Sequence, residues 1–417
     1  MPAPAHEFTT RSLWLSAALL TAATTTVTLG VLALLGTQTG HSLTWALSRW
    51  DAQYYMGIAE GGYFDPTSPV IDGPPWERTL AFFPALPAIL RVFHLAGIST
   101  LAAGVVVSQL FAVVACAGMM RLADKLNLNP FLAGTLLLGA PLAVTLTMPY
   151  SEALFLALAL WAVVFILEDK FFAAGLLCLV AGLVRLTAVD LIAVLVLVVT
   201  TRLLILPRLR AGREMRATEP AAGENTPSDA TTPAAATPVT TRGARLRAWA
   251  ATPLASWLGV LLAPLGLAGY LLYANRQLVD AGGYFGIQKD GWHSAFDFGQ
   301  ATVRFLHRVT TDPEADIGYF LSAAIMILIV VAVIASWRRL PWPVWLFGAA
   351  IAANVLLSDG IMHSRPRLLL PAYVLLLPLV GVMQRATGRT QLAVACGYLV
   401  CGAWISAYFL MVFPWAI

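Results

Sequence analysis

The chain alternates between long apolar runs and short polar segments. Ten runs approach or exceed the roughly 20 apolar residues that a helix needs to cross a bilayer. They lie at residues 13–36, 99–120, 130–149, 152–167, 171–206, 251–273, 317–336, 341–357, 368–384 and 391–413. The run at 171–206 is too long for one crossing and contains Arg185 and Asp190, so we predict a tight helical hairpin there. The pattern predicts an all-α polytopic membrane protein with about eleven transmembrane helices.

One further apolar segment, AFFPALPAILRVFHLAG at 81–97, decides the topology of everything after it. It contains two prolines, Arg91 and His94, and it is close to the lower length limit for a crossing. These features favour a helix that lies on the membrane surface. A second interfacial helix is expected near 48–60, so both belong to a first outer loop at 37–98.

Composition agrees with a membrane location and excludes several functions. Apolar residues make up 59% of the chain, charged residues only 12%, and the mean hydropathy is +0.76. A net charge of +4 gives no reason to expect a nucleic acid partner. The four cysteines all lie within apolar runs, so the sequence indicates neither a disulfide framework nor a metal site. We expect lipids or lipid-linked molecules as partners, and no cofactor.

Basic residues set the expected orientation. With 81–97 on the surface, 16 of the 26 Lys and Arg residues fall on one side of the membrane, which the positive-inside rule assigns to the cytoplasm. The N-terminus is then cytoplasmic, the C-terminus is outside, and the protein belongs to the cell (plasma) membrane. The outer segments are 37–98, 149–151, the turn at Arg185, 274–316 and 358–367, and most unusual polar residues fall within them.

Three parts of the chain follow from this map. Residues 1–206 form an N-terminal membrane module, and residues 251–417 form a C-terminal transmembrane module with an outer loop at 274–316. Between them, residues 207–250 are rich in Ala, Thr, Pro and Arg. We predict a disordered cytoplasmic linker there.

Asp51, in the segment SRWDAQYYMGIAEGGY at 48–63, is the most prominent candidate for catalysis. One interpretation is structural: Ser48 and Asp51 have the spacing of a helix capping box, and Trp50 and Tyr54 would be interfacial aromatic residues. The other is functional: Asp51 points into a chamber as a general base, with Tyr55 one turn further along the same face.

Further candidates occur at the other outer segments. Ser151 and Glu152 can cap the helix that follows them or bind substrate hydroxyls. Arginines on the outer side run against the positive-inside rule, so they either reach lipid phosphates or form a clamp for a substrate phosphate. The arginines proposed for this clamp are Arg185, Arg365 and Arg367. The segment YFGIQKDGWHSAFD at 284–297 mixes aromatic and polar groups that suit a sugar or a lipid headgroup.

One carboxylate with several arginines suits sugar transfer from a polyprenyl phosphate. The phosphate leaving group is stabilised by cations, so a single base that deprotonates the acceptor hydroxyl is sufficient. A glycosidase would need a second, paired carboxylate. A transporter would be expected to show internal repeats and charges near the membrane midplane, and neither is evident.

The chain resembles the PIG-V family of mannosyltransferases, which act in assembly of the GPI anchor, and its bacterial relatives. The motifs that carry the resemblance occur in family order: RWDAQYYMGIAEGGY at 49–63, AFFPALPAIL at 81–90, PYSEALF at 149–155, GLVRLTA at 182–188 and HSRPRLLLPAY at 363–373. A composition rich in Ala and Arg, with three lysines, suggests a bacterium of high GC content, such as an actinobacterium.

The resemblance implies a GT-C type glycosyltransferase that transfers mannose from polyprenyl-phosphate-mannose, with inversion, to a lipid or glycolipid acceptor outside the membrane. It implies Asp51 as general base and Arg185, Arg365 and Arg367 as ligands of the donor phosphate. Another polyprenyl-phosphate sugar or a protein acceptor remains an alternative, and a transporter is a more distant one. Substrate-binding candidates are Arg49, Trp50, Tyr54, Tyr55, Ser151, Glu152, Gln288, Trp292, His293 and His363.

Overall fold

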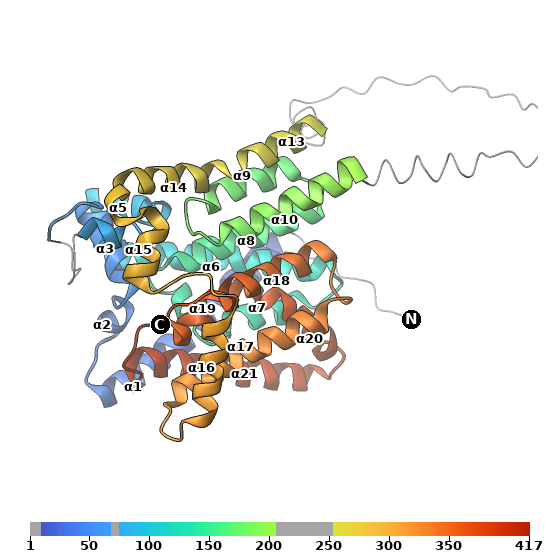
Figure 1. Cartoon of the computed structure of the whole chain (residues 1–417). Coiled ribbons are helices and arrows are strands. Elements are labelled where there is room, and N and C mark those ends of the chain that lie inside the picture. Colours follow the sequence, from blue (N-terminus) through green and yellow to red (C-terminus); the bar gives the residue numbers. More distant parts are fainter. Residues whose placement is uncertain (1–9, 68–74, 206–252) are drawn as a thin grey trace, which may run out of the picture.

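The computed structural model describes residues 10–67, 75–205 and 253–417, and within these residues the chain is helical without a β-sheet. Long helices run side by side across the view of Figure 1, while short helices gather at one end. The predicted linker at 207–250 lies outside the described residues. The N-terminal half contains α1 (Thr10–Thr39), α2 (Leu43–Leu47), α3 (Asp51–Gly61), α4 (Pro75–Thr79), α5 (Ala85–Leu95), α6 (Thr100–Lys125), α7 (Pro130–Leu138), α8 (Ser151–Leu167), α9 (Phe171–Ala181) and α10 (Ala188–Thr200).

The C-terminal half has the same character and ends with the longest of its helices. It contains α13 (Pro253–Leu262), α14 (Leu265–Gln277), α15 (Gly283–Trp292), α16 (Gln300–Thr311), α17 (Ile317–Ser336), α18 (Trp342–Leu356), α19 (Arg365–Leu368), α20 (Leu377–Met383) and α21 (Gly388–Met411). Short 3-10 segments at Ala143–Leu146, Val279–Ala281, Met362–Ser364 and Leu370–Leu376, and a π turn at Thr201–Ile205, connect some of these helices.

Five stretches of helix in the described residues are long and apolar enough to cross a membrane. They are α1, α6, α13 together with α14, α17 and α21. A sixth candidate, from Met362 to Met383, bends by 65° at its break, and α8, α9 and α18 are apolar but shorter. A polytopic helical membrane protein is therefore supported, whereas the predicted count of eleven spans is not confirmed.

Two predicted segments can be compared directly with the helices. The run at 171–206 is the predicted hairpin, because α9 ends at Ala181 and α10 begins at Ala188. The run at 130–149 differs from the prediction of one continuous span. Its helix α7 stops after nine residues, and Leu142 then takes a left-handed conformation with φ of 62°. Most residues of this run are buried inside the protein. This burial accounts for its apolar character without a membrane crossing.

The segment at 81–97 forms a short helix that packs against other helices and is hydrogen-bonded to neighbouring segments. Helix α5 has 11 residues and packs against α3 and α6. The amide of Ala85 donates to the carbonyl of Leu183 over 3.0 Å, and Arg91 donates to the carbonyl of Ala59 over 3.2 Å. A helix of this length is too short to cross a bilayer, and its location on the membrane surface stays a prediction.

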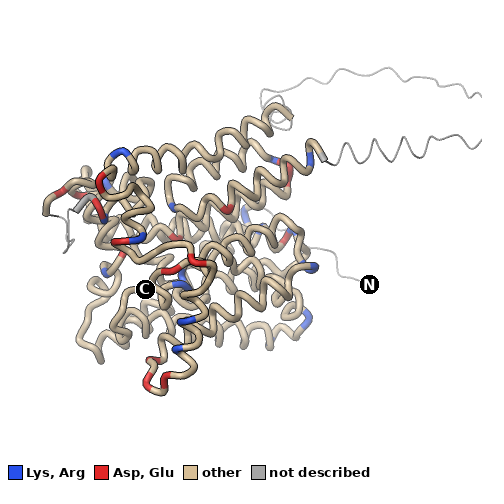
Figure 2. The backbone as a smooth tube through the Cα atoms, in the orientation of Figure 1, with Lys and Arg blue, Asp and Glu red and all other residues tan. Residues whose placement is uncertain are grey.

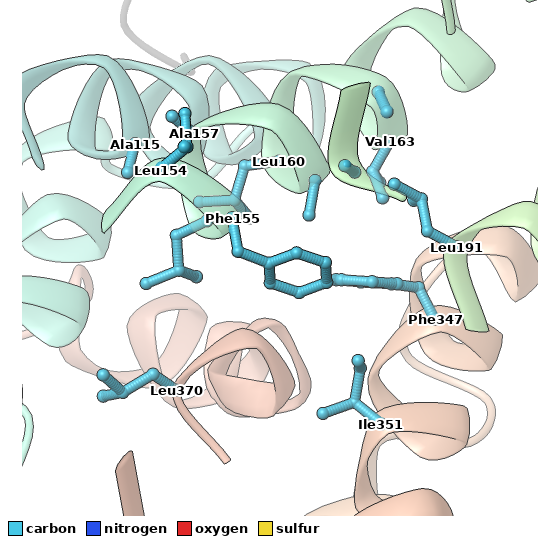
Figure 3. Packing of buried hydrophobic residues seen from close by; sticks show 14 of the residues in the cluster. Ala115, Leu154, Phe155, Ala157, Leu160, Val163, Leu191, Phe347, Ile351 and Leu370 are labelled. Atoms are coloured by element: carbon cyan, nitrogen blue, oxygen red, sulfur yellow. The ribbon is translucent and has the colours of Figure 1, made fainter. Parts of the chain in front are cut away.

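The two halves of the chain pack against each other along their lengths. Helix α1 lies against α21, α9 against α13, and α10 against α18. The contact between α9 and α13 is close because two glycines meet: a Cβ on Gly175 would lie 2.2 Å from the carbonyl oxygen of Gly259. Small residues of this kind let helix backbones approach within a membrane. Figure 3 shows the core at Phe155 of α8, close to Phe347 of α18.

Charged residues concentrate at the ends of the helices, and the long middle sections of the tube in Figure 2 are nearly free of them. One end carries the starts of α1 and α13 and the end of α10, and the other carries α2 to α5 and α15. Among the charged residues that the structure describes, Glu152, Arg365 and Arg367 are buried. Buried charges need partners, because isolated ions in an apolar environment are costly.

Candidate functional site

A cavity of about 360 Å³ lies at the end of the molecule that carries the short helices. Its lining comes from the start of α3, the segment at 81–83, the turn before α10, helix α15 and the segment from 354 to 368. Nine of the predicted site residues line it: Trp50, Asp51, Tyr54, Tyr55, Arg185, Gln288, Trp292, Arg365 and Arg367. Residues from four of the five outer segments predicted from the sequence therefore line one cavity, and the segment at 149–151 does not.

Asp51 is the first residue of α3, and no side chain caps this helix. The Ser48 hydroxyl donates to the carbonyl of Trp45 over 3.2 Å, so it does not serve Asp51. Trp50 occupies the cap position with φ of 58°, a conformation that residues with a side chain rarely adopt. The predicted capping box is absent, and the Asp51 carboxylate is free for another partner.

That partner is Arg367. Its Nη1 atom lies 2.6 Å from Oδ2 of Asp51 and 3.0 Å from Oε1 of Glu152. The same Glu152 oxygen lies 2.9 Å from Nη1 of Arg185. The four residues form an ionic chain of alternating sign, Asp51–Arg367–Glu152–Arg185, contributed by four separate segments. We refer to it below as the ionic chain.

Glu152 occupies the centre of the ionic chain and lies behind the cavity wall. Its side chain is only 2% exposed, and it does not line the cavity, and neither does Ser151. Ser151 accepts a hydrogen bond from the Tyr55 hydroxyl over 2.8 Å. Neither residue caps α8, so the capping interpretation is wrong, and the binding of substrate hydroxyls stays a prediction. Glu152 instead holds two arginines in place.

Tyr150 is a site residue that the sequence did not reveal. Its side chain is fully buried. Its hydroxyl accepts a hydrogen bond from the Asp51 amide over 3.2 Å and donates to the carbonyl of Arg49 over 3.3 Å. The Arg367 guanidinium lies over its ring, 5.1 Å from the centroid. Tyr150 therefore fixes both the start of α3 and the cation that Asp51 binds. The sequence signal that could have indicated Tyr150 is its position directly before Ser151 in the motif PYSE.

The environment of Asp51 affects its proton affinity in opposing directions. Burial raises the pKa of the carboxyl, the Arg367 guanidinium lowers the pKa, and the negative charge of Glu152 raises it again. The net result is a pKa above the usual range for aspartate. A carboxylate of this kind is a stronger base than one in water.

Arg365 differs from the other two arginines of the predicted clamp. It is 3% exposed, and among the described residues no carboxylate lies within ion-pairing distance of its guanidinium. Its Nη2 donates to the carbonyl of Ser358 over 2.6 Å, while its Nε has no partner. Arg365 lines the cavity, and a guanidinium without a carboxylate partner is suited to an anionic ligand.

Aromatic side chains from both halves of the chain form one wall of the cavity. Tyr54 stacks on Phe82 at 4.6 Å between ring centroids, and Trp292 meets each ring edge-on at 5.4 Å. Tyr54 is thus part of this wall, and the interfacial position considered for it differs from the structure. The indole nitrogens of Trp50 and Trp292 are buried donors without partners in the described residues. Gln288 donates to the Tyr284 hydroxyl over 3.0 Å.

Besides Ser151 and Glu152, three further predicted substrate-binding residues do not line the cavity. Arg49 lies between the rings of Trp45 and Trp50 and donates to the carbonyl of Leu410 over 3.0 Å. The His363 ring packs against Tyr319 and Phe413. His293 ends α15 with φ of 50°. Each of these residues supports the wall through packing or backbone geometry. Within the described ranges, no group of three or more His, Cys, Asp or Glu residues is arranged to hold a metal ion.

Fold and site together define a class: a polytopic helical membrane protein with a buried ionic chain beside a cavity at one end of its helices. No family model matches the chain, and no solved structure matches it. Among curated proteins, the chain is similar to GPI alpha-1,6-mannosyltransferase 2 from Rattus norvegicus, with 31% identity over 158 residues. The match covers 35% of this chain, which spans less than a third (30%) of the length of that relative. The similarity supports a mannosyltransferase-like chain among the glycosyltransferases.

Proposed function

We propose that the protein is a membrane mannosyltransferase that transfers mannose from polyprenyl-phosphate-mannose to a lipid or glycolipid acceptor, with inversion at the anomeric carbon. The observation that carries this proposal is the cavity in which a carboxylate of raised basicity and a buried, unpaired arginine occur together. The partial similarity to a mannosyltransferase supports the choice of sugar. The motifs in which the sequence resembles the PIG-V family support the proposal of a GT-C fold.

Asp51 acts as general base in this proposal. It takes the proton of the acceptor hydroxyl while the hydroxyl oxygen forms a bond to the anomeric carbon of mannose. The bond from that carbon to the phosphate oxygen breaks on the opposite face, and polyprenyl phosphate leaves with the electron pair. One base is sufficient because a phosphate leaving group requires no proton.

Arg365 is the proposed ligand of the donor phosphate. We assign different roles to the three arginines because their ion pairs differ. Arg185 and Arg367 are each paired with a carboxylate of the ionic chain, so their charge is largely neutralised. Arg365 keeps its charge available. It would stabilise the negative charge that develops on the leaving phosphate, while Arg367 orients Asp51.

We further propose that the cavity faces the outside of the cell membrane. The support is the distribution of basic residues along the sequence, which favours a cytoplasmic N-terminus and an external C-terminus. Cysteine labelling tests this assignment. A cysteine at position 290 should react with an impermeant reagent added outside intact cells, whereas one at position 225 should not. Reaction of both from the same side would contradict the proposed topology.

The activity itself is tested with the purified full chain in detergent or nanodiscs. Polyprenyl-phosphate-mannose and a membrane lipid extract are supplied, and the mannosylated product is identified by mass spectrometry. Formation of a mannosyl lipid that requires Asp51 supports the proposal. Transfer from another polyprenyl-phosphate sugar, with none from the mannose donor, would retain the mechanism and replace the sugar. No transfer from any such donor would overturn the proposal.

A further inference from the structure

Asp190 and Asn354 form a polar contact beside the cavity that the ionic chain does not include. Asp190 lies in the first turn of α10, and Asn354 lies in the last turn of α18. The amide Nδ2 of Asn354 donates to Oδ2 of Asp190 over 3.0 Å. Both side chains are half-buried, and Asn354 lines the cavity whereas Asp190 does not. Asp190 thus contacts the cavity wall from behind, through Asn354.

The chemistry of this pair determines which way the Asn354 amide faces. An ionised carboxylate can only accept hydrogen bonds, so Asp190 must face the NH₂ group of the amide. The carbonyl oxygen Oδ1 of Asn354 is then turned away from Asp190. Within the described residues Oδ1 has no hydrogen-bond partner. Asn354 therefore has an acceptor to offer at the cavity.

An acceptor in this position complements the other groups that line the cavity. Trp50, Trp292 and Arg365 line the cavity, and their side chains can only donate hydrogen bonds. Such donors suit phosphate oxygens and the oxygens of a sugar, but the hydrogen of a sugar hydroxyl needs an acceptor. If Asn354 could rotate freely, its NH₂ group would add a further donor. Asp190 prevents that rotation.

The geometry points to Asp190 as a positioning residue that holds the Asn354 amide so that Oδ1 accepts a hydrogen bond from a hydroxyl of the donor sugar. This inference rests on the proposed function and identifies the part of the site that recognises the sugar, as distinct from the phosphate. A site built to pair with a hydroxyl discriminates against a ligand that lacks it, because its own polar group is left unpaired.

Two lipids separate sugar recognition from phosphate recognition. Heptaprenyl-phosphate-mannose and heptaprenyl phosphate are titrated into the full chain in nanodiscs, and the intrinsic fluorescence of cavity tryptophans such as Trp50 and Trp292 reports binding. Asp190→Asn and Asn354→Leu should each weaken binding of the mannose lipid by about three- to tenfold, the value of one hydrogen bond. Binding of heptaprenyl phosphate should not change, because Arg365 is untouched.

A paired exchange and a control make the test specific. Asp190→Asn combined with Asn354→Asp restores a donor opposite a carboxylate and leaves a carboxylate oxygen for the cavity, so the double variant should recover affinity for the mannose lipid. Asp169→Asn removes an exposed carboxylate elsewhere and should bind both lipids as the wild type does.

The outcomes separate this inference from the proposed function. Unchanged affinity of both single variants for the mannose lipid would overturn the inference while leaving the donor assignment intact. An equal loss of affinity for both lipids would also overturn it, because the pair would then have a merely structural role. If the wild type binds neither lipid, the proposed function fails and the inference fails with it.

Discussion

The carboxylate of Asp51 and the guanidinium of Arg367 lie 2.6 Å apart, although they belong to opposite halves of the chain. Glu152 contacts the same nitrogen of Arg367 from the other side. Arg367 is therefore held by two carboxylates, and Asp51 has one oriented oxygen and a fixed cation beside it. This arrangement defines the position of the proposed base before any substrate binds.

Replacement of the proposed base should abolish transfer. Asp51→Asn keeps the size of the side chain but removes its proton affinity, so mannose transfer should fall by at least about 100-fold. The lost ion pair should lower the free energy of unfolding by about 1–3 kcal/mol, since Glu152 still neutralises Arg367. Asp280→Asn, an exposed position, is the matched control. Substantial transfer by a folded Asp51→Asn protein would show that Asp51 is not the base.

The pH dependence of transfer should report the carboxyl of Asp51. Only the ionised form can accept a proton, so kcat/KM should fall as the pH drops through a pKa above the usual aspartate range. The Arg367 cation lowers this pKa, so Arg367→Gln should raise it and move the acidic limb to higher pH. A pH–rate profile of both proteins measures the shift. A limb that stays in place or moves to lower pH would contradict the assignment.

Glu152 should matter more for stability than a surface carboxylate does. Glu152→Gln removes the charge at the centre of the ionic chain and leaves Arg185 without its carboxylate. Breaking a buried ion pair from one side typically costs about 3–5 kcal/mol. Thermal unfolding in detergent should show this loss, and Glu314→Gln, at an exposed position, should show none. Equal melting temperatures for the two variants would mean that the ionic chain is not buried as described.

Tyr150 should act through its hydroxyl. Tyr150→Phe keeps the ring under Arg367 but leaves the Asp51 amide and the Arg49 carbonyl without this partner. We expect a stability loss of about 1–3 kcal/mol, together with slower transfer because the start of α3 is less well fixed. Tyr273→Phe, an exposed tyrosine, is the control. If Tyr150→Phe transfers mannose at the wild-type rate, the hydroxyl does not position Asp51.

Arg365 should determine affinity for the phosphate. Arg365→Lys keeps a positive charge but loses the planar fork of donors, so affinity for heptaprenyl phosphate should fall by about tenfold. Arg304→Lys makes the same change on a side chain that is 62% exposed and should bind normally. Fluorescence titration measures both proteins. Unchanged binding by Arg365→Lys would move the phosphate to another part of the cavity.

The sequence predicted many of the residues that gather at one cavity, and their roles stay predictions. Span counting placed Asp51, Arg185 and Arg367 on one side of the membrane, and all three line one cavity. Their mutual pairing was not predictable, because it depends on the packing of four segments that lie far apart in the chain. The capping roles considered for Glu152 and Ser151 were wrong, because a polar residue at a helix start resembles a cap or a ligand equally well.

The helices show a similar limit. Hydrophobic runs located the hairpin of α9 and α10 correctly, since a long run interrupted by Arg185 must turn. The run at 130–149 was equally apolar, yet it breaks at Gly139 and Leu142 and folds inside the protein. Apolarity reports burial, and the protein interior and the lipid bilayer both provide it. Length and turn geometry distinguish them only once the neighbouring helices are known.

The ionic chain also has a consequence for biosynthesis. Asp51, Glu152 and Arg185 are made long before Arg367, so a nascent chain would carry the two carboxylates into the membrane with one cation. Glu152 and Arg185 can neutralise each other at that stage, because both belong to the N-terminal half. Asp51 gains its cation only once the segment with Arg367 has been synthesised. The proposed catalytic centre is thus completed only after the segment that carries Arg367 has been made, and a product truncated before that segment would lack it.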